Sequence, residues 1–589
     1  MGFRRLNWFV WALTLVAVAE GTAPVRLSAP AFYLSWLRTQ LSHERLTAAA
    51  VVGGRDGNSS SAVEFLEAPA GGSASSATIE STGKVPVADA WLVPSYRLSD
   101  LAAGSGEAAD VSHLVYADRG LAWWDVPHSM RDALAIISTR AVAVPIGAGP
   151  LLLWYRGDVL GALAAEVPRT WQQLLAFAER YAASRQPGQP QHALCLPLGP
   201  DCTHLHLLSA VWASVAQTRS RRQGLAFDPW AGAPRIDTAG LRYALELLAN
   251  LTRHSEPSWR QQGPGGSGCG SGASNSPFTS GACALTLATV GLARDADGPP
   301  GDLGATVRVA SAPGSGVVWS PTSGKLVDCT KKACPLGEGL PTAGGVWVNY
   351  SPQLTAASLT GVIRASAPAE QQFKAYVVLT LLATGDALGT ADLLGPVRGS
   401  ELWPTADPGP DGAGLRGEAW RLSALAITHP NAGWDTSIPR IQILRDELAQ
   451  LLSRAQACAI VSQAGQQTCG DILGQALQAS QARIAVAYPP AEFLQWYQAH
   501  LHLDHATHDW GTDASTDAAA DQGGTGSRVV VVAVASSLCG ALLVVALLLL
   551  MQRRRLTLLG HVVSKLMPQR RSEAMAPGPS QDACLVITE

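Results

Sequence analysis

An uninterrupted apolar run near the C-terminus, VVVVAVASSLCGALLVVALLLLM at 529–551, constrains this chain more than any other feature. About twenty such residues cross the hydrocarbon core of a bilayer, where only a helix or a closed barrel satisfies its own backbone hydrogen bonds. Arg553, Arg554 and Arg555 follow the run directly, whereas aspartates dominate the preceding segment. The positive-inside rule therefore predicts a type I single-pass protein of the plasma membrane, with an extracellular ectodomain and a cytoplasmic C-terminus.

The N-terminus has the pattern of a secretory signal. Arg4 and Arg5 precede a short apolar run that ends in Ala17-Val18-Ala19, which is typical of a cleaved signal peptide. An uncleaved signal anchor is the alternative. We therefore divide the chain into a signal peptide (1–19), an ectodomain (25–505), a juxtamembrane linker (506–528), the transmembrane helix (529–551) and a cytoplasmic tail (552–589).

The cysteines and glycosylation motifs agree with an extracellular ectodomain. An even number of cysteines in a secreted region favours disulfides, and their short spacings suggest local loops, although spacing alone leaves the connectivity open. Sequons at Asn58, Asn250 and Asn349 are candidate glycosylation sites. The candidate disulfide cysteines are Cys195 and Cys202, Cys269 and Cys283, Cys329 and Cys334, and Cys458 and Cys469.

Apolar runs alternate with amphipathic helices through the ectodomain. The wholly apolar residues 151–155 precede a helix whose start is marked by Thr170 and Gln173, the capping-box pattern S/T-x-x-E/Q. Behind this cap, apolar residues recur at i, i+3, i+4 and i+7 from Trp171 to Ala178. A buried strand that feeds such a helix indicates half of a βαβ unit, and strands mixed with helices indicate an α/β fold.

Further helices follow the same logic. One apolar helix stripe runs through Leu241, Ala244, Leu245, Leu248 and Leu251, with Asp237 or Thr238 as the cap. A glycan on Asn250 would point away from that stripe into water. Helices are also predicted at 370–385, 441–458, 471–484 and 490–501.

Five segments, in this order along the chain, carry a resemblance to a known family. They are DAWLVPSYRLSDLAA, VPIGAGPLLLWYRGDVL with EVPRTWQQLL, FDPWAGAPRIDTAGLRYALELL, FTSGACALTLATVG and GGVWVNYSPQLTAAS. They resemble motifs of the family-1 extracellular solute-binding proteins, the maltose-binding-protein-like class that serves bacterial sugar importers. The resemblance spans most of residues 60–500 and rests on the order of the motifs.

This resemblance implies a bilobal α/β ectodomain with a periplasmic-binding-protein-like, type II-like fold, whose two lobes close on a ligand. Where maltose-binding members carry an acidic ligand residue, this chain has a glycine, and the aromatic residue expected after FTSGACALT is missing. A maltose-like ligand is therefore not implied. The positions that match ligand-binding segments are Asp89 and Trp91, Gly149 and Tyr155, and Gly345 and Trp347.

We expect a membrane-anchored extracellular receptor that captures a small polar ligand, with carbohydrate as one candidate class, in an inter-lobe cleft and without catalysis. The partners would be that ligand, the lipid bilayer and a membrane signalling subunit. The alternative is a structural or adhesion glycoprotein of the cell surface with a degenerate cleft. A glycan-processing enzyme would need two carboxylates that flank the cleft, and the sequence does not place two together.

Several function classes are disfavoured by the sequence. It contains no G-x-S-x-G, H-E-x-x-H or P-loop motif, so no enzyme and no cofactor are predicted. A net charge of −3 argues against nucleic acid as a partner. The histidines at 500, 502, 505 and 508 match no compact metal-binding spacing, and no metal is predicted.

Overall fold

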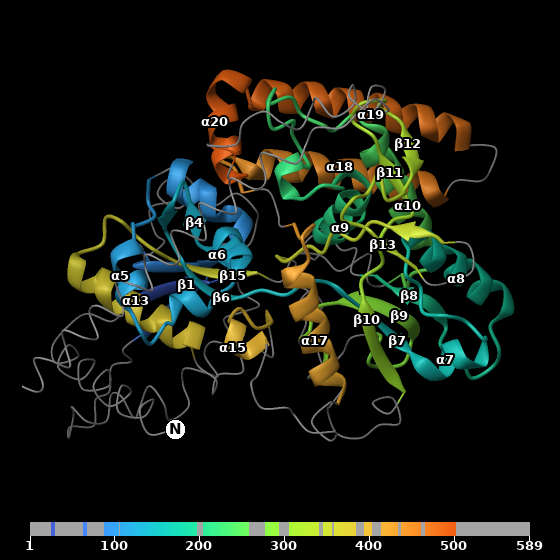
Figure 1. Cartoon of the computed structure of the whole chain (residues 1–589), viewed down its shortest axis with the longest axis horizontal. Helices are drawn as coiled ribbons and strands as arrows, with labels where there is room; N and C mark the ends of the chain where they lie inside the picture. Colours follow the sequence, from blue (N-terminus) through green and yellow to red (C-terminus); the bar gives the residue numbers. More distant parts are fainter. Residues whose placement is uncertain are drawn as a thin grey trace, which may run out of the picture. The chain divides into compact units, whose positions relative to one another are not determined.

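Two β-sheets, each with its own hydrophobic core, organise the chain in this computed structural model (Figure 1). All described residues belong to one compact unit, which runs from Met1 to His505. The structure describes residues 25–29, 63–67, 88–104, 106–196, 204–257, 277–293, 306–340, 345–355, 358–384, 394–402, 414–433, 437–460, 466–501 and 503.

The first sheet has the strand order β2-β1-β3-β15-β6. Strand β1 is parallel to both of its neighbours, whereas β15 is antiparallel to β3 and to β6. The carboxyl ends of β1, β2, β3 and β6 therefore share one edge with the amino end of β15. The strands are β1 (Val25–Ala29), β2 (Val63–Glu67), β3 (Ala90–Val93), β6 (Val144–Gly147) and β15 (Leu359–Ile363).

The second sheet has the order β10-β7-β9-β8. Strand β7 is antiparallel to β9 and β10, and only β8 and β9 are parallel. The predicted βαβ unit is therefore wrong: β7 precedes helix α8 (Trp171–Ser184) as expected, but the next strand, β8, runs antiparallel to β7, with β9 between them. The strands are β7 (Leu152–Arg156), β8 (His192–Cys195), β9 (Cys283–Ala288) and β10 (Val307–Ser311).

The predicted helix starts are confirmed. Helix α8 (Trp171–Ser184) has a complete capping box, in which Thr170 Oγ1 accepts from the Gln173 amide at 3.1 Å and Gln173 Oε1 accepts from the Thr170 amide at 3.1 Å. Helix α10 (Ala239–Arg253) is capped by Thr238, whose hydroxyl accepts from the Leu241 amide at 3.3 Å. The apolar stripe of α10 is buried as expected, and Asn250 is half-buried beside it.

The later predicted helices are also present, with ends that differ by a few residues. They are α13 (Ala369–Thr384), α18 (Ile441–Ile460), α19 (Gln466–Ala487) and α20 (Pro490–His500). Helix α13 is buried around most of its circumference, since even Lys374 is only 8 % exposed.

The remaining elements complete the described part of the chain. The helices are α5 (Ser112–Ala117), α6 (His128–Leu134), α7 (Gly157–Ala162), α9 (His204–Ala216), α15 (Gly399–Leu402) and α17 (Leu415–Thr428), with single turns η1 (Ser95–Arg97), η2 (Asp100–Gly104), η3 (Trp123–Asp125) and η4 (Arg221–Gln223). The strands are β4 (Ile136–Ile137), β5 (Arg140–Ala141), β11 (Val317–Trp319), β12 (Leu326–Asp328), β13 (Glu338–Gly339) and β14 (Trp347–Val348).

We call the first sheet with α6 and α13 the first half, because these helices pack on its strands. The second half is the second sheet with α8, α9, α10, α18 and α19, which contact that sheet or one another. A third apolar cluster joins α6, α15 and α17 to Ala148, in the segment between the two sheets.

The disulfides correct the expected local pairing. Cys195 is bonded to Cys283, at a sequence separation of 88, and this bond joins the neighbouring strands β8 and β9. The other two described disulfides, Cys329–Cys334 and Cys458–Cys469, are local as predicted. Cys202 and Cys269 lie outside the described residues. Spacing misled here because the strand pairing brings distant cysteines together.

No helix within the described part of the chain is both long and apolar enough for a membrane crossing. The predicted transmembrane segment 529–551 lies outside the described residues, as do the signal peptide (1–19), the linker (506–528), the tail (552–589) and Asn58.

Candidate functional site

A short segment joins one edge of the first sheet to one edge of the second. Strand β6 ends at Gly147 and β7 begins at Leu152, so the two strand ends are at most roughly 18 Å apart. Leu152 pairs with Ala288 and Ser311, which end β9 and β10. We call these two strand edges the linked edges. Ligands of open α/β sheets bind outside the carboxyl ends of strands, and such ends meet here.

Neutral hydroxyl groups lie at the linked edges. Ser95, just after β3, and Ser358, just before β15, are buried, with their hydroxyl oxygens 2.8 Å apart. Thr289 directly follows β9 and is 3 % exposed, and its hydroxyl has no hydrogen-bond partner among the described residues. A buried hydroxyl without a partner costs folding free energy, so Thr289 is suited to meet a polar group from outside the protein.

Gly149 is the one predicted ligand position in the segment between the linked edges, and its environment is crowded. A Cβ atom on Gly149 would lie 2.8 Å from the carbonyl oxygen of Leu394. Gly395 has a φ of +115°, and a Cβ there would lie 2.4 Å from the carbonyl oxygen of Ala148. Two backbone segments therefore pass too closely for side chains, which explains why no acidic ligand residue stands at position 149.

Asp89 lies at the opposite edge of the first sheet, so the expectation that it binds ligand is not supported. Its carboxylate accepts from the backbone amide of Arg26 at 3.0 Å and from its guanidinium at 3.0 Å, and Arg364 Nη2 lies 3.6 Å away. Asp89 precedes β3, whereas the linked edge begins after Val93. The ion pair with Arg26 links β1 to the residue that precedes β3. Trp91 is half-buried within β3 and packs on the core of the first half.

Tyr155, Gly345 and Trp347 lie in other surroundings. Tyr155 stands inside β7, opposite Arg308 and Leu285, and burial raises the pKa of its hydroxyl. Gly345 is exposed with a φ of +63°, and the Trp347 indole donates to the carbonyl oxygen of Cys334 at 2.9 Å. Trp347 thus packs beside the Cys329–Cys334 disulfide. The six predicted positions therefore do not form one site.

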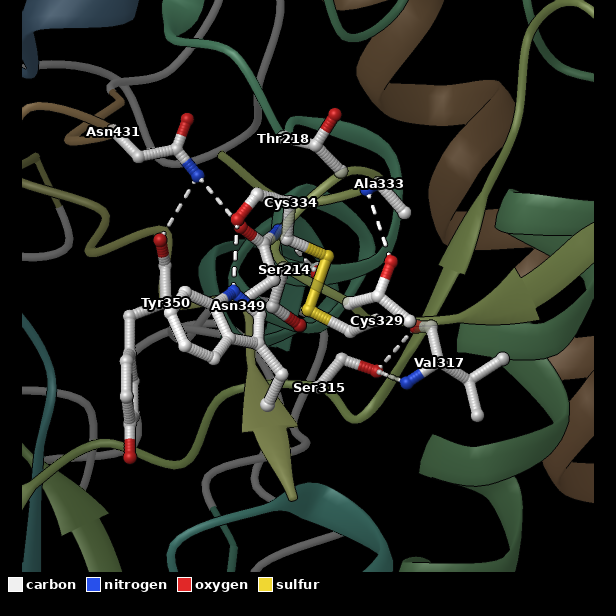
Figure 2. Close-up of a disulfide and its surroundings, with 12 residues drawn as sticks. Ser214, Thr218, Ser315, Val317, Cys329, Ala333, Cys334, Asn349, Tyr350 and Asn431 are labelled. Carbon is white, nitrogen blue, oxygen red and sulfur yellow. Dashed lines mark hydrogen bonds between the residues drawn. A yellow bond between two sulfur atoms is a disulfide. The ribbon is translucent and has the colours of Figure 1, made fainter. Parts of the chain in front are cut away.

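Asn349, predicted as a glycosylation site, is fully buried. Figure 2 draws it together with Asn431 and Tyr350. Its side-chain nitrogen donates to the carbonyl oxygens of Ser214 at 2.7 Å and Gln217 at 2.9 Å. Asn431 donates to Asn349 Oδ1 at 3.2 Å and to the carbonyl oxygen of Tyr350 at 2.9 Å. A glycan on Asn349 is incompatible with this arrangement, because the nitrogen that would carry it already makes two interior hydrogen bonds.

Sequence reasoning did not single out Ser95, Ser358 or Thr289. Each of the three is a hydroxyl residue next to a strand end, a position at the linked edge in this topology. That signal could be used only after the strand order was known. Among the described residues, no group of three or more His, Cys, Asp or Glu side chains could hold a metal ion.

Comparisons with known proteins agree with this fold. Residues 62–332 match the family model described as bacterial extracellular solute-binding protein. No curated protein matches the chain significantly.

Among solved structures, a solute-binding protein of Agrobacterium radiobacter K84 in complex with ribitol has a TM-score of 0.53 at 17 % identity, covering 78 % of this chain and 98 % of that chain. Maltose-bound MalE3 of T. maritima has a TM-score of 0.53 at 15 % identity, covering 78 % of this chain and 99 % of that chain. A protein of Agrobacterium vitis S4 with bound D-mannitol has a TM-score of 0.51 at 16 % identity, covering 79 % of this chain and 99 % of that chain. Solute-binding proteins of this type bind ligands without catalysis, as the sequence predicted for this chain. The chain thus has the mixed α/β fold of the periplasmic sugar-binding proteins, and residues 62–332 match the extracellular solute-binding family.

Proposed function

We propose that this chain captures a neutral sugar or polyol at the linked edges, between its two halves, and holds it without chemical change. The observation that carries the proposal is the placement of uncharged hydroxyl groups, above all the unpartnered Thr289, where the strand ends of both sheets meet. Hydroxyl side chains both donate and accept hydrogen bonds, which suits a polyhydroxylated ligand. The likeness to ribitol-bound and D-mannitol-bound proteins supports the same ligand class.

The fold offers a simple way to hold such a ligand. Each half has its own core, so the halves can move as bodies about the segments that connect them. A ligand that contacts both halves stabilises their closed arrangement. Thr289 would bind from the second half and Ser95 with Ser358 from the first.

The proposal includes the membrane topology predicted from sequence. Residues 529–551 anchor the protein, with the binding unit on the extracellular side. A second membrane subunit would receive the signal of ligand binding.

A ligand screen on the full-length protein in detergent tests the proposal. Ribitol, mannitol and maltose are compared with amino acids and oligopeptides by thermal shift, since a ligand that binds the folded state raises Tm as its concentration exceeds Kd. We expect a saturable shift from at least one sugar or polyol. Saturable shifts from the amino acids or peptides alone would contradict a polyol site.

Thr289→Val provides a matched variant, because it replaces the hydroxyl by a methyl group of similar size. Loss of the Thr289 hydroxyl should weaken sugar binding about tenfold, as expected for one buried hydrogen bond. Thr384→Val is the control, since the Thr384 hydroxyl bonds within its own helix to the carbonyl oxygen of Thr380. Equal ligand affinity in both variants would remove Thr289 from the site.

A structural or adhesion glycoprotein is the second candidate. The observation that favours it is the pairing of Ser95 with Ser358, which satisfies these hydroxyls without a ligand. A well-folded sample that gives no shift with any compound of the panel would support this alternative.

A further inference from the structure

An ion pair connects the two halves. Asp132, on α6 of the first half, accepts from Arg221 Nη2 at 2.8 Å, and Arg221 lies in η4, directly after α9 of the second half. The Asp132 side chain is 1 % exposed, and His128 Nδ1 lies 2.9 Å from Asp132 Oδ2. Burial lowers the pKa of Arg221 to about 10, so its guanidinium remains charged at neutral pH. A carboxylate buried this deeply depends on its cationic partner.

A second set of contacts connects the halves beyond the end of β3. Ser99 Oγ donates to the carbonyl oxygen of Ser437 at 2.8 Å, and the Ser99 amide donates to Ser437 Oγ at 3.2 Å. Both serines are buried. The backbone amide of Arg440, which precedes α18 of the second half, donates to Asp100 Oδ1 at 2.6 Å.

The segment before α18 is held in place for this contact. Arg440 is a non-glycine residue with a φ of +60°, a backbone conformation that must be supported by its surroundings. Tyr488 supports it by donating its hydroxyl to the carbonyl oxygen of Arg440 at 2.6 Å. One turn further, the guanidinium of Arg445 lies 3.8 Å from the ring centroid of Tyr96, in the first half. This geometry is favourable for a cation–π contact.

We propose that the Asp132–Arg221 and Ser99–Ser437 contacts form a latch that holds the two halves together through protein groups alone. The arrangement in which these contacts form is then the main resting state of the protein, and we infer that it is the closed one, to which ligand adds further contacts. A hinge protein without such contacts closes mainly when ligand bridges its lobes. The latch itself does not depend on the proposed ligand, whereas its effect on ligand affinity rests on the proposed function.

The test measures the distance between the halves in the full-length protein in detergent, with no sugar added. Spectroscopic labels are placed at two exposed positions, Arg119 in the first half and Arg180 on α8. Arg221→Gln removes the positive charge that pairs with Asp132. Ser437→Ala is a milder second variant that should fold even if the first does not. The control is Arg421→Gln, which breaks the exposed Arg421–Glu418 pair within α17.

We expect one narrow distance distribution in the wild-type protein and in the control. In each latch variant a longer-distance population should rise on the order of tenfold, as expected for loss of a buried charged or hydroxyl contact. A broad wild-type distribution, or latch variants that match the control, would overturn the proposal.

Mannitol binding is measured separately on the same proteins. Since apparent affinity scales with the closed fraction, the latch variants should bind mannitol more weakly than the control does. If no sugar binds any of the proteins, the proposed function fails while the distance measurement still decides whether the latch exists. If the variants open but bind mannitol as tightly as the control does, the latch does not assist capture.

Discussion

Asn431 and Asn349 meet through their side-chain amides, 3.2 Å apart, and neither side chain is exposed. Asn349 in turn donates to two carbonyl oxygens at the end of α9 and just beyond it, so this pair binds the segment after β14 and the segment after α17 to the second half. The pair stabilises the interior at a position where the sequence suggested a surface glycan.

Asn349→Ala should therefore destabilise the fold. The variant removes three buried hydrogen bonds, those that Asn349 donates to the carbonyl oxygens of Ser214 and Gln217 and the one that it accepts from Asn431. We therefore expect the free energy of unfolding to fall by about 2–4 kcal/mol. Chemical denaturation measures the change, with the half-buried Asn250→Ala as the control. Mass spectrometry of the full-length protein from a glycosylating host should find position 349 without glycan, and a glycosylated Asn349 would contradict the buried arrangement.

Gly149→Ala should destabilise the connection between the sheets. The added Cβ meets the Leu394 carbonyl oxygen at 2.8 Å, and backbone atoms cannot move aside as easily as side-chain ends, so a loss of about 1–3 kcal/mol is expected. Gly161→Ala is a matched control in α7, where a Cβ meets nothing within 4 Å. The control should be neutral or stabilise by up to about 1 kcal/mol, because alanine favours a helix. Equal melting temperatures for the two variants would refute the close approach.

The two kinds of disulfide should differ in their contribution to stability. In the loop-entropy description, Cys195–Cys283, at a separation of 88, contributes about 4–5 kcal/mol, whereas Cys329–Cys334, at a separation of 5, contributes about 2 kcal/mol. Two double variants, in which both cysteines of one disulfide are replaced by alanine, are compared by chemical denaturation. The variant that lacks Cys195–Cys283 should lose more stability than the one that lacks Cys329–Cys334. Peptide mapping without reduction should recover a Cys195–Cys283 cross-link, and a Cys195–Cys202 cross-link in its place would show that the strand pairing is wrong.

His429 should make stability depend on pH. Its Nδ1 accepts from the Asn431 amide at 3.1 Å, and burial lowers its pKa below the ordinary 6.5, against the opposing attraction of Glu338, 3.9 Å from Nε2. The unfolded chain therefore binds a proton more readily than the folded protein does. The contribution to stability is full above pH 6.5 and falls as the pH drops below that value.

Melting curves at pH 7.5 and pH 5 for the wild type and His429→Gln check this prediction. The wild type should lose more stability on acidification than the variant does, since glutamine does not titrate. A variant that loses as much as the wild type would exclude His429 as the cause.

Most helices could be predicted from the sequence, and the candidate site could not. The capping box of α8 needs only Thr170 and Gln173, three residues apart, so its partners are fixed before any tertiary contact forms. The predicted ligand positions Asp89, Tyr155 and Trp347 depended on motif order, which says nothing about the edge of the sheet on which a residue falls. Asp89 lies at the amino end of β3, opposite the linked edge, and its carboxylate forms ion pairs with Arg26 and Arg364.

The sequence by itself determined where helices begin, which runs become buried strands and that the unit mixes both, because these properties depend on neighbours within one or two turns. Only the tertiary structure decided that β9 lies between β7 and β8, that Cys195 meets Cys283, and that Asn349 is interior. These outcomes join segments tens to more than a hundred residues apart. Such contacts are set by which sheet edges and apolar faces fit together once the chain has folded, and no local pattern of residues encodes that choice.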